Sequence, residues 1–339
     1  MAERGRRNGG RRVVAIGGGT GLPVVLAALK RYLGGRVTSL TAVVTVTDDG
    51  GSSGRLRDEL QVLPPGDIRN CLVALAEVEP LMAELFQFRF PGEGGLAGHS
   101  FGNLFLAALT HVTGNFLQAI RISGKVLAVR GTILPSTLDG VRLGAELTDG
   151  RRILGESQIS RQGVPIRRVF LDPGHARALP EVLEAIAHAH VVVLAPGSLY
   201  TSLIPTLLVD GVADALRGAA AIKICVANLM TEPGETDRMS LGDHLDALYA
   251  HGGRGVIDGV VVHGRSLPPD VVARYARAGA MPVTAADRER VRAMGIWVME
   301  ADLAGPTELA RHHPEKLGRV LVRLIRHGGP VRRPAAVRV

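Results

Sequence analysis

Residues 12–21 read Arg-Val-Val-Ala-Ile-Gly-Gly-Gly-Thr-Gly, a short apolar run that ends in a glycine-rich turn. Residues 22–32 then place apolar side chains at helical spacing. A strand, a glycine turn and a helix in this order predict a βα unit whose backbone amides can hold a phosphate. The dinucleotide fingerprint is incomplete, because Leu22 or Val24 stands where its third glycine belongs. We expect a phosphate cradle formed by Gly18, Gly19, Thr20 and Gly21.

The order of strand and then helix recurs along the chain. Further apolar strands are expected at residues 40–47, 126–133, 190–195, 221–227 and 259–262. Helices are expected at residues 22–32, 68–88, 103–112, 180–187, 203–216, 241–249, 269–278 and 314–326. The pattern predicts an α/β, Rossmann-like, doubly wound and mostly parallel sheet with helices on both faces. Residues 134–169 break the rhythm and predict a small β-rich insertion.

Composition and charge suit one globular domain, at residues 12–327, between two flexible basic tails at residues 1–11 and 328–339. The formal net charge is +8, but residues 1–12 carry +4 and residues 319–339 carry +6, so the body is about −2. Binding to the phosphate backbone of a nucleic acid requires a basic surface on the folded domain. Stacking on single strands requires aromatic side chains, and only 4% of the residues are aromatic. Specific binding to nucleic acid is therefore not expected.

The cysteines and the apolar runs indicate the cellular compartment of the protein. Cys71 and Cys225 are far apart in apolar segments, which predicts two buried thiols rather than a disulfide or a zinc site. The basic start lacks the apolar region of a signal peptide, and no run approaches 18 apolar residues. We expect a cytoplasmic protein without membrane insertion.

The most informative segment is residues 47–57, Thr-Asp-Asp-Gly-Gly-Ser-Ser-Gly-Arg-Leu-Arg, at the end of the second strand. Asp48 and Asp49 can each give one oxygen to Mg²⁺, with phosphates completing the octahedron. No cofactor is certain from the sequence, and Mg²⁺ is the candidate. A plain loop with one aspartate as a helix cap is the alternative. The phosphate ligands expected here are Gly50, Gly51, Ser52, Ser53 and Arg55.

Two motifs stand at predicted helix starts. In residues 65–70, Pro-Gly-Asp-Ile-Arg-Asn, Asp67 is a helix N-cap or a catalytic group, and Arg69 and Asn70 face a bound anion from the first turn. Residues 98–103, Gly-His-Ser-Phe-Gly-Asn, fit the G-x-S-x-G pattern of serine hydrolases. A glycine-rich segment precedes the serine instead of a buried strand, so we expect ligand contacts from Ser100 and Asn103 rather than a nucleophile.

A second phosphate cradle is expected at residues 196–202, Pro-Gly-Ser-Leu-Tyr-Thr-Ser, which join a strand to a helix. Its ligand groups would be Gly197, Ser198, Thr201 and Ser202. Asn228 and His263 follow two further strands, at the edge where open α/β sheets bind ligands. Asn228 is expected to contact the ligand, and a structural role is favoured for His263.

The ordered motifs resemble the gluconeogenesis factor family (YvcK-like) within the superfamily of 2-phospho-L-lactate transferases (CofD-like). The resemblance rests on residues 17–21, 48–57, 66–70, 98–103, 196–202 and 228–230, and it spans about residues 12 to 325. It implies a Rossmann-like fold that binds a nucleotide. The transferase branch moves a phospholactyl group from a nucleotide to a deazaflavin precursor with Mg²⁺. The YvcK-like branch binds UDP-sugars and supports gluconeogenic growth and cell shape.

The carboxyl-terminal third resembles the YvcK-like branch. Residues 275–283, Tyr-Ala-Arg-Ala-Gly-Ala-Met-Pro-Val, and residues 311–317, Arg-His-His-Pro-Glu-Lys-Leu, carry the likeness. It implies that Tyr275 and Arg311 contact the nucleotide sugar. The aromatic face of Tyr275 can stack on the base, and the guanidinium of Arg311 can bind the diphosphate. His263 departs from the family pattern, in which asparagine is expected.

Two hypotheses about function follow. The first is a UDP-sugar-binding regulator of gluconeogenic growth and cell-wall homeostasis without a catalytic residue, and the alternative is an Mg²⁺-dependent transferase of the phospholactyl type. A nicotinamide-dependent oxidoreductase is disfavoured by the incomplete fingerprint. The first hypothesis is compatible with a homo-oligomer and with regulatory protein partners.

Overall fold

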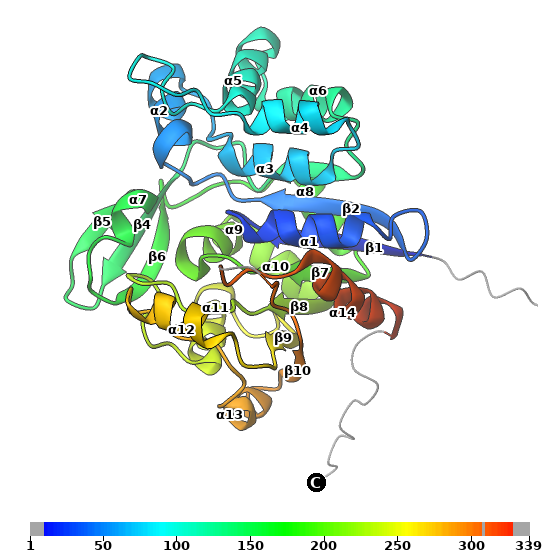
Figure 1. Ribbon diagram of the computed structural model, residues 1–339, viewed down its shortest axis with the longest axis vertical. Coiled ribbons are helices and arrows are strands. Elements are labelled where there is room, and N and C mark those ends of the chain that lie inside the picture. Colours follow the sequence, from blue (N-terminus) through cyan, green and yellow to red (C-terminus); the bar gives the residue numbers. More distant parts are fainter. Residues whose placement is uncertain (1–9, 307–308, 328–339) are drawn as a thin grey trace, which may run out of the picture.

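The computed structural model describes residues 10–306 and 309–327, and a seven-stranded parallel sheet forms its centre (Figure 1). The strand order is β10-β9-β8-β7-β1-β2-β3. The chain moves outward from β1 to β3 and then returns to place β7 on the other side of β1. The switch point of the sheet therefore lies between β1 and β7. The strands are β1 (Arg11–Gly17), β2 (Val37–Val44), β3 (Thr132–Pro135), β7 (Val191–Leu194), β8 (Ile222–Val226), β9 (Gly259–His263) and β10 (Trp297–Ala301).

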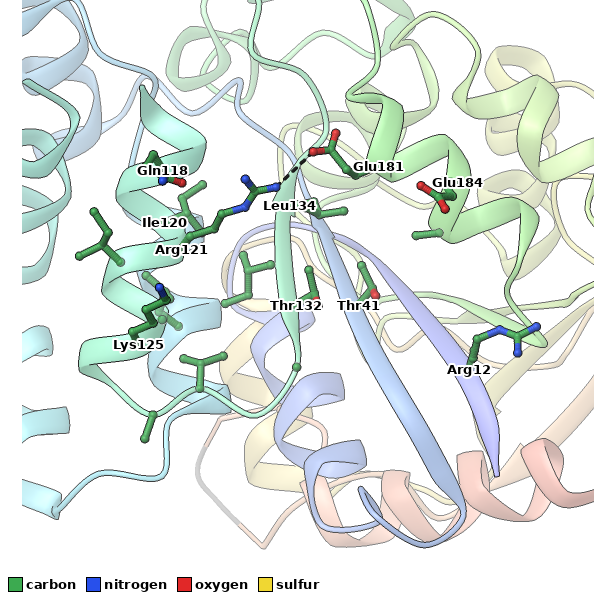
Figure 2. A pocket seen from close by; sticks show the side chains of 18 of the residues that line it. Arg12, Thr41, Gln118, Ile120, Arg121, Lys125, Thr132, Leu134, Glu181 and Glu184 are labelled. Carbon is green, nitrogen blue, oxygen red and sulfur yellow. Dashed lines mark hydrogen bonds and ion pairs between the residues drawn. The ribbon is translucent and has the colours of Figure 1, made fainter. Parts of the chain in front are cut away.

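Helices cover both faces of this sheet, as the sequence predicts. Alternate residues of β1 enter separate cores, with Val13 in one and Val14 in the other, and both are at most 2% exposed. The first core is covered by α1 (Gly21–Lys30), α3 (Gly66–Leu75) and α14 (Pro314–His327), and α1 and α14 lie side by side (Figure 1). The second face carries α8 (Pro180–Ala187), α10 (Val212–Gly218) and α11 (Leu241–Gly252). A groove remains on this face between α6 (Phe116–Val126) and α8 (Figure 2).

The β-rich insertion is present as a three-stranded antiparallel sheet in the order β5-β4-β6. Its strands are β4 (Arg142–Leu147), β5 (Arg152–Leu154) and β6 (Ile166–Asp172), with the short helix α7 (Glu156–Ile159) between β5 and β6. The inward side chains of β4 and β6, such as Leu143 and Val169, join the core of the second face. The insertion is thus packed against the main sheet.

Three expected elements are wrong in their bounds because the chain breaks where periodicity alone predicts continuity. The expected helix 68–88 is two helices, α3 and α4 (Pro80–Gln87), since Pro80 lacks an amide hydrogen and Glu79 before it is extended. The expected helix 203–216 is interrupted at Gly211, whose φ is +87°, giving α9 (Ile204–Leu207) and α10. The expected strand 126–133 begins only at Thr132, because α6 continues to Val126.

Other elements were not expected from the sequence. Residues 51–60 form a helix, α2 (Gly51–Leu60), rather than an open loop, with Gly50 as its N-cap. The helix α6, the single π-helical turn η1 (Leu199–Leu203) and the helix α13 (Arg288–Ala293) were also not expected. The expected helices at residues 103–112 and 269–278 are present as α5 (Phe101–Thr113) and α12 (Pro269–Ala276). Of the expected tails, residues 1–9 and 328–339 lie outside the described residues, whereas Arg11 already pairs with Val37 in the sheet.

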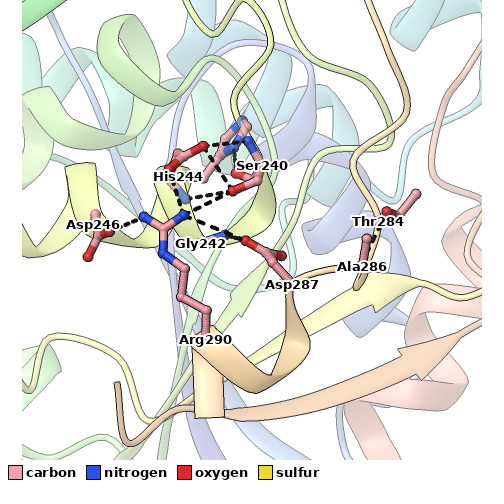
Figure 3. A network of polar contacts seen from close by, with 9 residues as sticks. Ser240, Gly242, His244, Asp246, Thr284, Ala286, Asp287 and Arg290 are labelled. Carbon is pink, nitrogen blue, oxygen red and sulfur yellow. Dashed lines mark hydrogen bonds and ion pairs between the residues drawn. The ribbon is translucent and has the colours of Figure 1, made fainter. Parts of the chain in front are cut away.

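A polar network holds α13 against α11 (Figure 3). Ser240 and Asp243 form a capping box at the start of α11. Arg290 of α13 donates to Asp243 at 2.8 Å and to Asp246 at 2.6 Å. Asp287 accepts the amide hydrogen of Gly242 at 2.8 Å. Side-chain pairing therefore adds to the burial of Val291 in positioning α13 and the strand β10 that follows it.

Within the part of the chain that the structure describes, no helix has both the length and the apolar composition that crossing a membrane requires.

Adding a side chain at the switch point is expected to destabilise the fold. An ideal Cβ on Gly21 would lie 1.7 Å from the carbonyl oxygen of Pro196, so Gly21→Ala should lower the free energy of unfolding by about 3 kcal/mol or more. The control is Gly140→Ala, whose Cβ meets no atom within 4 Å and should change stability by less than about 0.5 kcal/mol. Urea unfolding of both variants is the measurement, and equal midpoints would contradict the steric argument.

Candidate functional site

The two predicted cradles meet at the switch point of the sheet. Residues 18–21 follow β1 and residues 196–202 come after β7, and Gly21 packs directly on the backbone of Pro196. Gly19 has a φ of +59°, in the left-handed region that favours glycine. The amide of Gly197 donates to Asn228 Oδ1 at 2.8 Å, and Asn228 Nδ2 donates back to the carbonyl of Gly197 at 2.8 Å. Asn228 therefore braces the second cradle.

A cavity of about 160 Å³ lies beside the first cradle. The amino-terminal turns of α2 and α3 open into it, and neither N-cap residue, Gly50 or Pro65, makes a side-chain cap. Free amides at helix starts attract anions. The lining is almost wholly polar and contains nine of the predicted site residues. The cavity is lined by Asp48, Gly50, Gly51, Ser52, Ser53, Gly66, Asp67, Arg69, Asn70, Arg89 and Asn103.

Buried polar side chains form the wall of the cavity. Ser52 Oγ lies 3.0 Å from His99 Nδ1 and accepts a hydrogen bond from Asn103 Nδ2 at 3.1 Å. Arg69, only 7% exposed, donates to Asn70 Oδ1 at 2.8 Å. Asn103 Oδ1 and Arg69 Nε are buried and have no protein partner. Because unpaired buried polar atoms are costly, these two atoms favour a polar ligand or water in the cavity.

The adjacent aspartates face different partners. Asp48 lines the cavity, and its Oδ1 accepts the amide hydrogen of Gly50 at 2.9 Å. Asp49 Oδ1 instead accepts the amide hydrogen of Ser157, in the insertion, at 2.8 Å. Among residues 10–306 and 309–327, no group of three or more His, Cys, Asp or Glu side chains has the geometry of a metal site. The pairing of Asp48 and Asp49 on one Mg²⁺ stays a prediction.

Asp67 is not the N-cap of α3, because that helix begins at Gly66 with Pro65 as its N-cap. Asp67 Oδ2 accepts the amide hydrogen of Gly19 at 2.7 Å and so joins the first cradle to α3. Burial raises the pKa of Asp67 to about 6, and the charge of Asp48 adds to the shift. The carboxylate therefore already accepts the amide hydrogen of Gly19, one of the predicted phosphate ligands.

Two carboxylates that sequence reasoning missed lie near the same crevice. Burial raises the pKa of Glu156, in α7, to about 9, and the charges of Asp48, Asp67 and Asp49 add to it. Burial also raises the pKa of Glu235 to about 7, and Thr201 Oγ1 donates to its Oε1 at 3.1 Å. Neither glutamate belongs to a recognisable motif, so only the folding of the insertion identifies Glu156 and only the folding of the segment after β8 identifies Glu235.

The remaining predicted ligands are divided between the cradles and the surrounding loops. Arg55 donates to the carbonyl of Ala97 at 2.5 Å and does not line the cavity, whereas Arg89, which was not predicted, does. Ser100 is the N-cap of α5 and accepts the amide hydrogen of Asn103. Thr20 is exposed and makes no cap, while Ser198 bonds to Glu232 and Ser202 is 6% exposed.

Tyr275 and Arg311 lie in two segments that contact each other. Tyr275 Oη accepts the amide hydrogen of Ala310 at 3.2 Å, and Arg311 is exposed. His312 Nε2 lies 3.1 Å from the carbonyl of Ala227, at the end of β8, and burial lowers its pKa to about 4. The neutral imidazole thus anchors Arg311 near the ligand edge, although neither Tyr275 nor Arg311 lines the 160 Å³ cavity. His263 accepts the amide hydrogen of Leu303, the structural role expected for it.

The crowded carboxylates predict that stability falls as the pH rises. The folded protein retains the proton of Glu156 up to a pKa of about 9, whereas the unfolded chain loses it near 4.5. The contribution of this group to the free energy of unfolding is therefore largest below pH 4.5 and is lost as the pH approaches 9. Glu156→Gln should raise the free energy of unfolding at pH 8 by at least about 1 kcal/mol and flatten this dependence. Thermal melting from pH 5 to pH 9 tests the prediction, with the exposed Glu84→Gln as control. Equal slopes for Glu156→Gln and the wild type would contradict it.

Comparison with known proteins places the chain among relatives that share its fold. A sequence model described as "2-phospho-L-lactate transferase CofD" matches residues 13–304. The gluconeogenesis factor of Halalkalibacterium halodurans is 46% identical over 318 residues, which cover 92% of this chain and 96% of the relative. The gluconeogenesis factor of Bacillus subtilis is 44% identical over 316 residues, which cover 93% of this chain and 98% of the relative. A crystal structure of protein BH3568 from Bacillus halodurans superposes with a TM-score of 0.89 at 46% identity, covering 92% of this chain and 99% of the other. The chain belongs to the CofD family.

Proposed function

We propose that this protein is a nucleotide-sugar-binding regulator that holds the diphosphate of a UDP-sugar at the carboxyl edge of the sheet. The observation that carries the proposal is the polar 160 Å³ cavity, into which two uncapped helix starts and the buried side chain of Arg69 open. Helix amides and a guanidinium are the groups that proteins use for phosphate oxygens. Binding of the diphosphate in this way does not require catalysis.

The base and the sugar are assigned to the part of the crevice beyond the cavity. Tyr275 offers an aromatic face in α12, and Arg311 is an exposed cation on the neighbouring segment. Stacking on uracil and a second contact to the diphosphate are the chemistry expected of these two groups. Relatives named gluconeogenesis factors support a role in growth on gluconeogenic carbon sources. We extend the proposal to cell-wall homeostasis and cell shape, through regulatory protein partners that read the bound state.

Calorimetric titration with UDP-sugars tests this function. Tyr275→Ala and Arg311→Ala should each weaken binding at least about tenfold, or about 1.4 kcal/mol. Ser52→Ala should weaken it through the cavity, because Ser52 lies between His99 and Asn103. Arg319→Ala, an exposed arginine of α14, is the matched control and should bind normally. Failure of every UDP-sugar to bind the folded wild type would remove the proposal.

A transferase of the phospholactyl type is the second candidate, and the position of Asp48 favours it. Asp48 lines the cavity and has carboxylate neighbours in Asp67 and Glu156. The carboxylate of Asp48 is the oxygen donor that would hold Mg²⁺ together with ligand phosphates, and the ion would supply charge neutralisation when bound. Asp49 fits less well, because its Oδ1 is already bonded to Ser157. Asp67, held by Gly19, is placed to orient an acceptor hydroxyl.

An activity assay separates the two candidates. Nucleotide-activated phospholactate and a deazaflavin acceptor are incubated with the protein and Mg²⁺, and transfer is followed by product formation. Turnover that is lost in Asp48→Asn, with Glu84→Gln unaffected, would promote the enzyme. Absence of turnover in protein that binds the nucleotide would leave the regulator.

A further inference from the structure

Helix α4 is apolar on two faces, whereas a helix at the surface of a protein usually has one apolar face. On its inner face, Phe86 is buried in the first core and Met82 packs beside it. The outer face carries Leu81 and Leu85, and Phe88 follows directly after the helix ends. These last three side chains are 73%, 39% and 47% exposed, respectively. A second apolar stripe of α4 therefore stays open to solvent.

The outer stripe has the spacing of a docking face. Leu81, Leu85 and Phe88 stand at positions i, i+4 and i+7, so their directions differ by only about 60° around the helix axis. α4 lies beyond α3, on the side away from the central sheet (Figure 1). A single exposed apolar residue needs no explanation, but a contiguous apolar patch marks an interaction surface. Apolar residues at this spacing are typical of a helix that packs against a partner.

The charges around the stripe are mostly acidic. Residues 77–96 contain four glutamates and one cation, Arg89, which lines the phosphate cavity. Glu79, Glu84 and Glu93 are exposed, and none of them has an ion-pair partner in the part of the chain that the structure describes. The fourth glutamate is held in an ion pair. An apolar stripe between free carboxylates is complementary to a surface that is both apolar and basic.

We infer that the outer face of α4 is the docking surface for a basic amphipathic helix of a partner protein. Apolar side chains of that helix pack on Leu81, Leu85 and Phe88, and its lysines and arginines pair with the free glutamates. A second copy of this chain is disfavoured, because two α4 faces would set Glu84 against the acidic side chains of the other copy. The same charges disfavour an anionic membrane surface.

The inference rests on the proposed function for its biological role, since that function requires partner proteins that read the bound state. Phe88 is followed by Arg89, a residue of the phosphate cavity, and the rings of Phe88 and Phe90 are in contact with centroids 5.2 Å apart. A helix seated on the stripe is therefore next to a segment that lines the ligand site.

Binding of a synthetic helix tests the surface without any nucleotide. The probe is a fluorescent peptide of about 18 residues, with leucine at every third or fourth position and lysine or arginine elsewhere. The wild type should bind it, and Leu81→Ala, Leu85→Ala and Glu84→Lys should each weaken binding at least about fivefold in fluorescence anisotropy. Val112→Ala is the matched control, because Val112 is 82% exposed on α5, and it should bind like the wild type.

A second peptide separates a docked helix from attraction to positive charge alone. It has the same composition in scrambled order, so its leucines form no single face, and it should bind at least about tenfold more weakly. Equal binding of the two peptides would overturn the inference, as would a wild type that binds neither or α4 variants that bind as the wild type does. Unchanged melting temperatures show that the variants are folded.

Two other occupants have their own signatures. Self-association of the wild type that Leu85→Ala abolishes in sedimentation velocity runs would assign α4 to a second copy and overturn the inference. Peptide binding that appears only after residues 328–339 are removed would assign α4 to that basic segment, with the same consequence. The α4 variants should still bind UDP-sugars normally, so failure of this docking surface leaves the proposed function intact.

Discussion

The close contact between the first and second cradles is the constraint on which the rest of the site depends. β1 and β7 are neighbours in the sheet but separated by about half the chain, and their following turns touch where Gly21 meets Pro196. This contact brings two helix starts to one edge, and Asn228 and Asp67 fix the turns from either side through hydrogen bonds to Gly197 and Gly19. A side chain in place of the glycine would separate the cradles and with them the amides that a diphosphate needs.

Carboxylates are crowded in the crevice. Carboxylates from β2, α3, the insertion and the segment after β8 converge, and the raised pKa values of Glu156 and Asp67 follow from their burial and mutual repulsion. Phosphates alone would worsen this repulsion, so the arrangement favours ligands that arrive with a cation or with protons. Arg69 and Arg89 place positive charge in the same cavity lining as Asp48 and Asp67.

The sequence was sufficient for the sheet, the cradles and most cavity residues, because strands buried on both faces and glycine turns leave local patterns. It was insufficient where contacts between residues far apart in the sequence determine the local structure. Residues 51–60 look like a glycine and serine loop but fold as α2, and Asp67 looks like a cap but bonds to Gly19, 48 positions away. Glu156 and Arg89 belong to no motif, and only the packing of the insertion and of the loop before α5 places them. The short α13 shows no clear periodicity, since it buries only Val291 and is otherwise held by Arg290.

The hydrogen bond from the Ser157 amide to Asp49 joins residues 108 positions apart and ties the small sheet to the end of β2. That carboxylate stands next to Asp48, which faces the cavity. The Ser157–Asp49 hydrogen bond therefore fixes the insertion against the backbone that carries Asp48. A displacement of the three-stranded sheet would move that backbone, so the shape of the cavity depends on a part of the chain that does not line it.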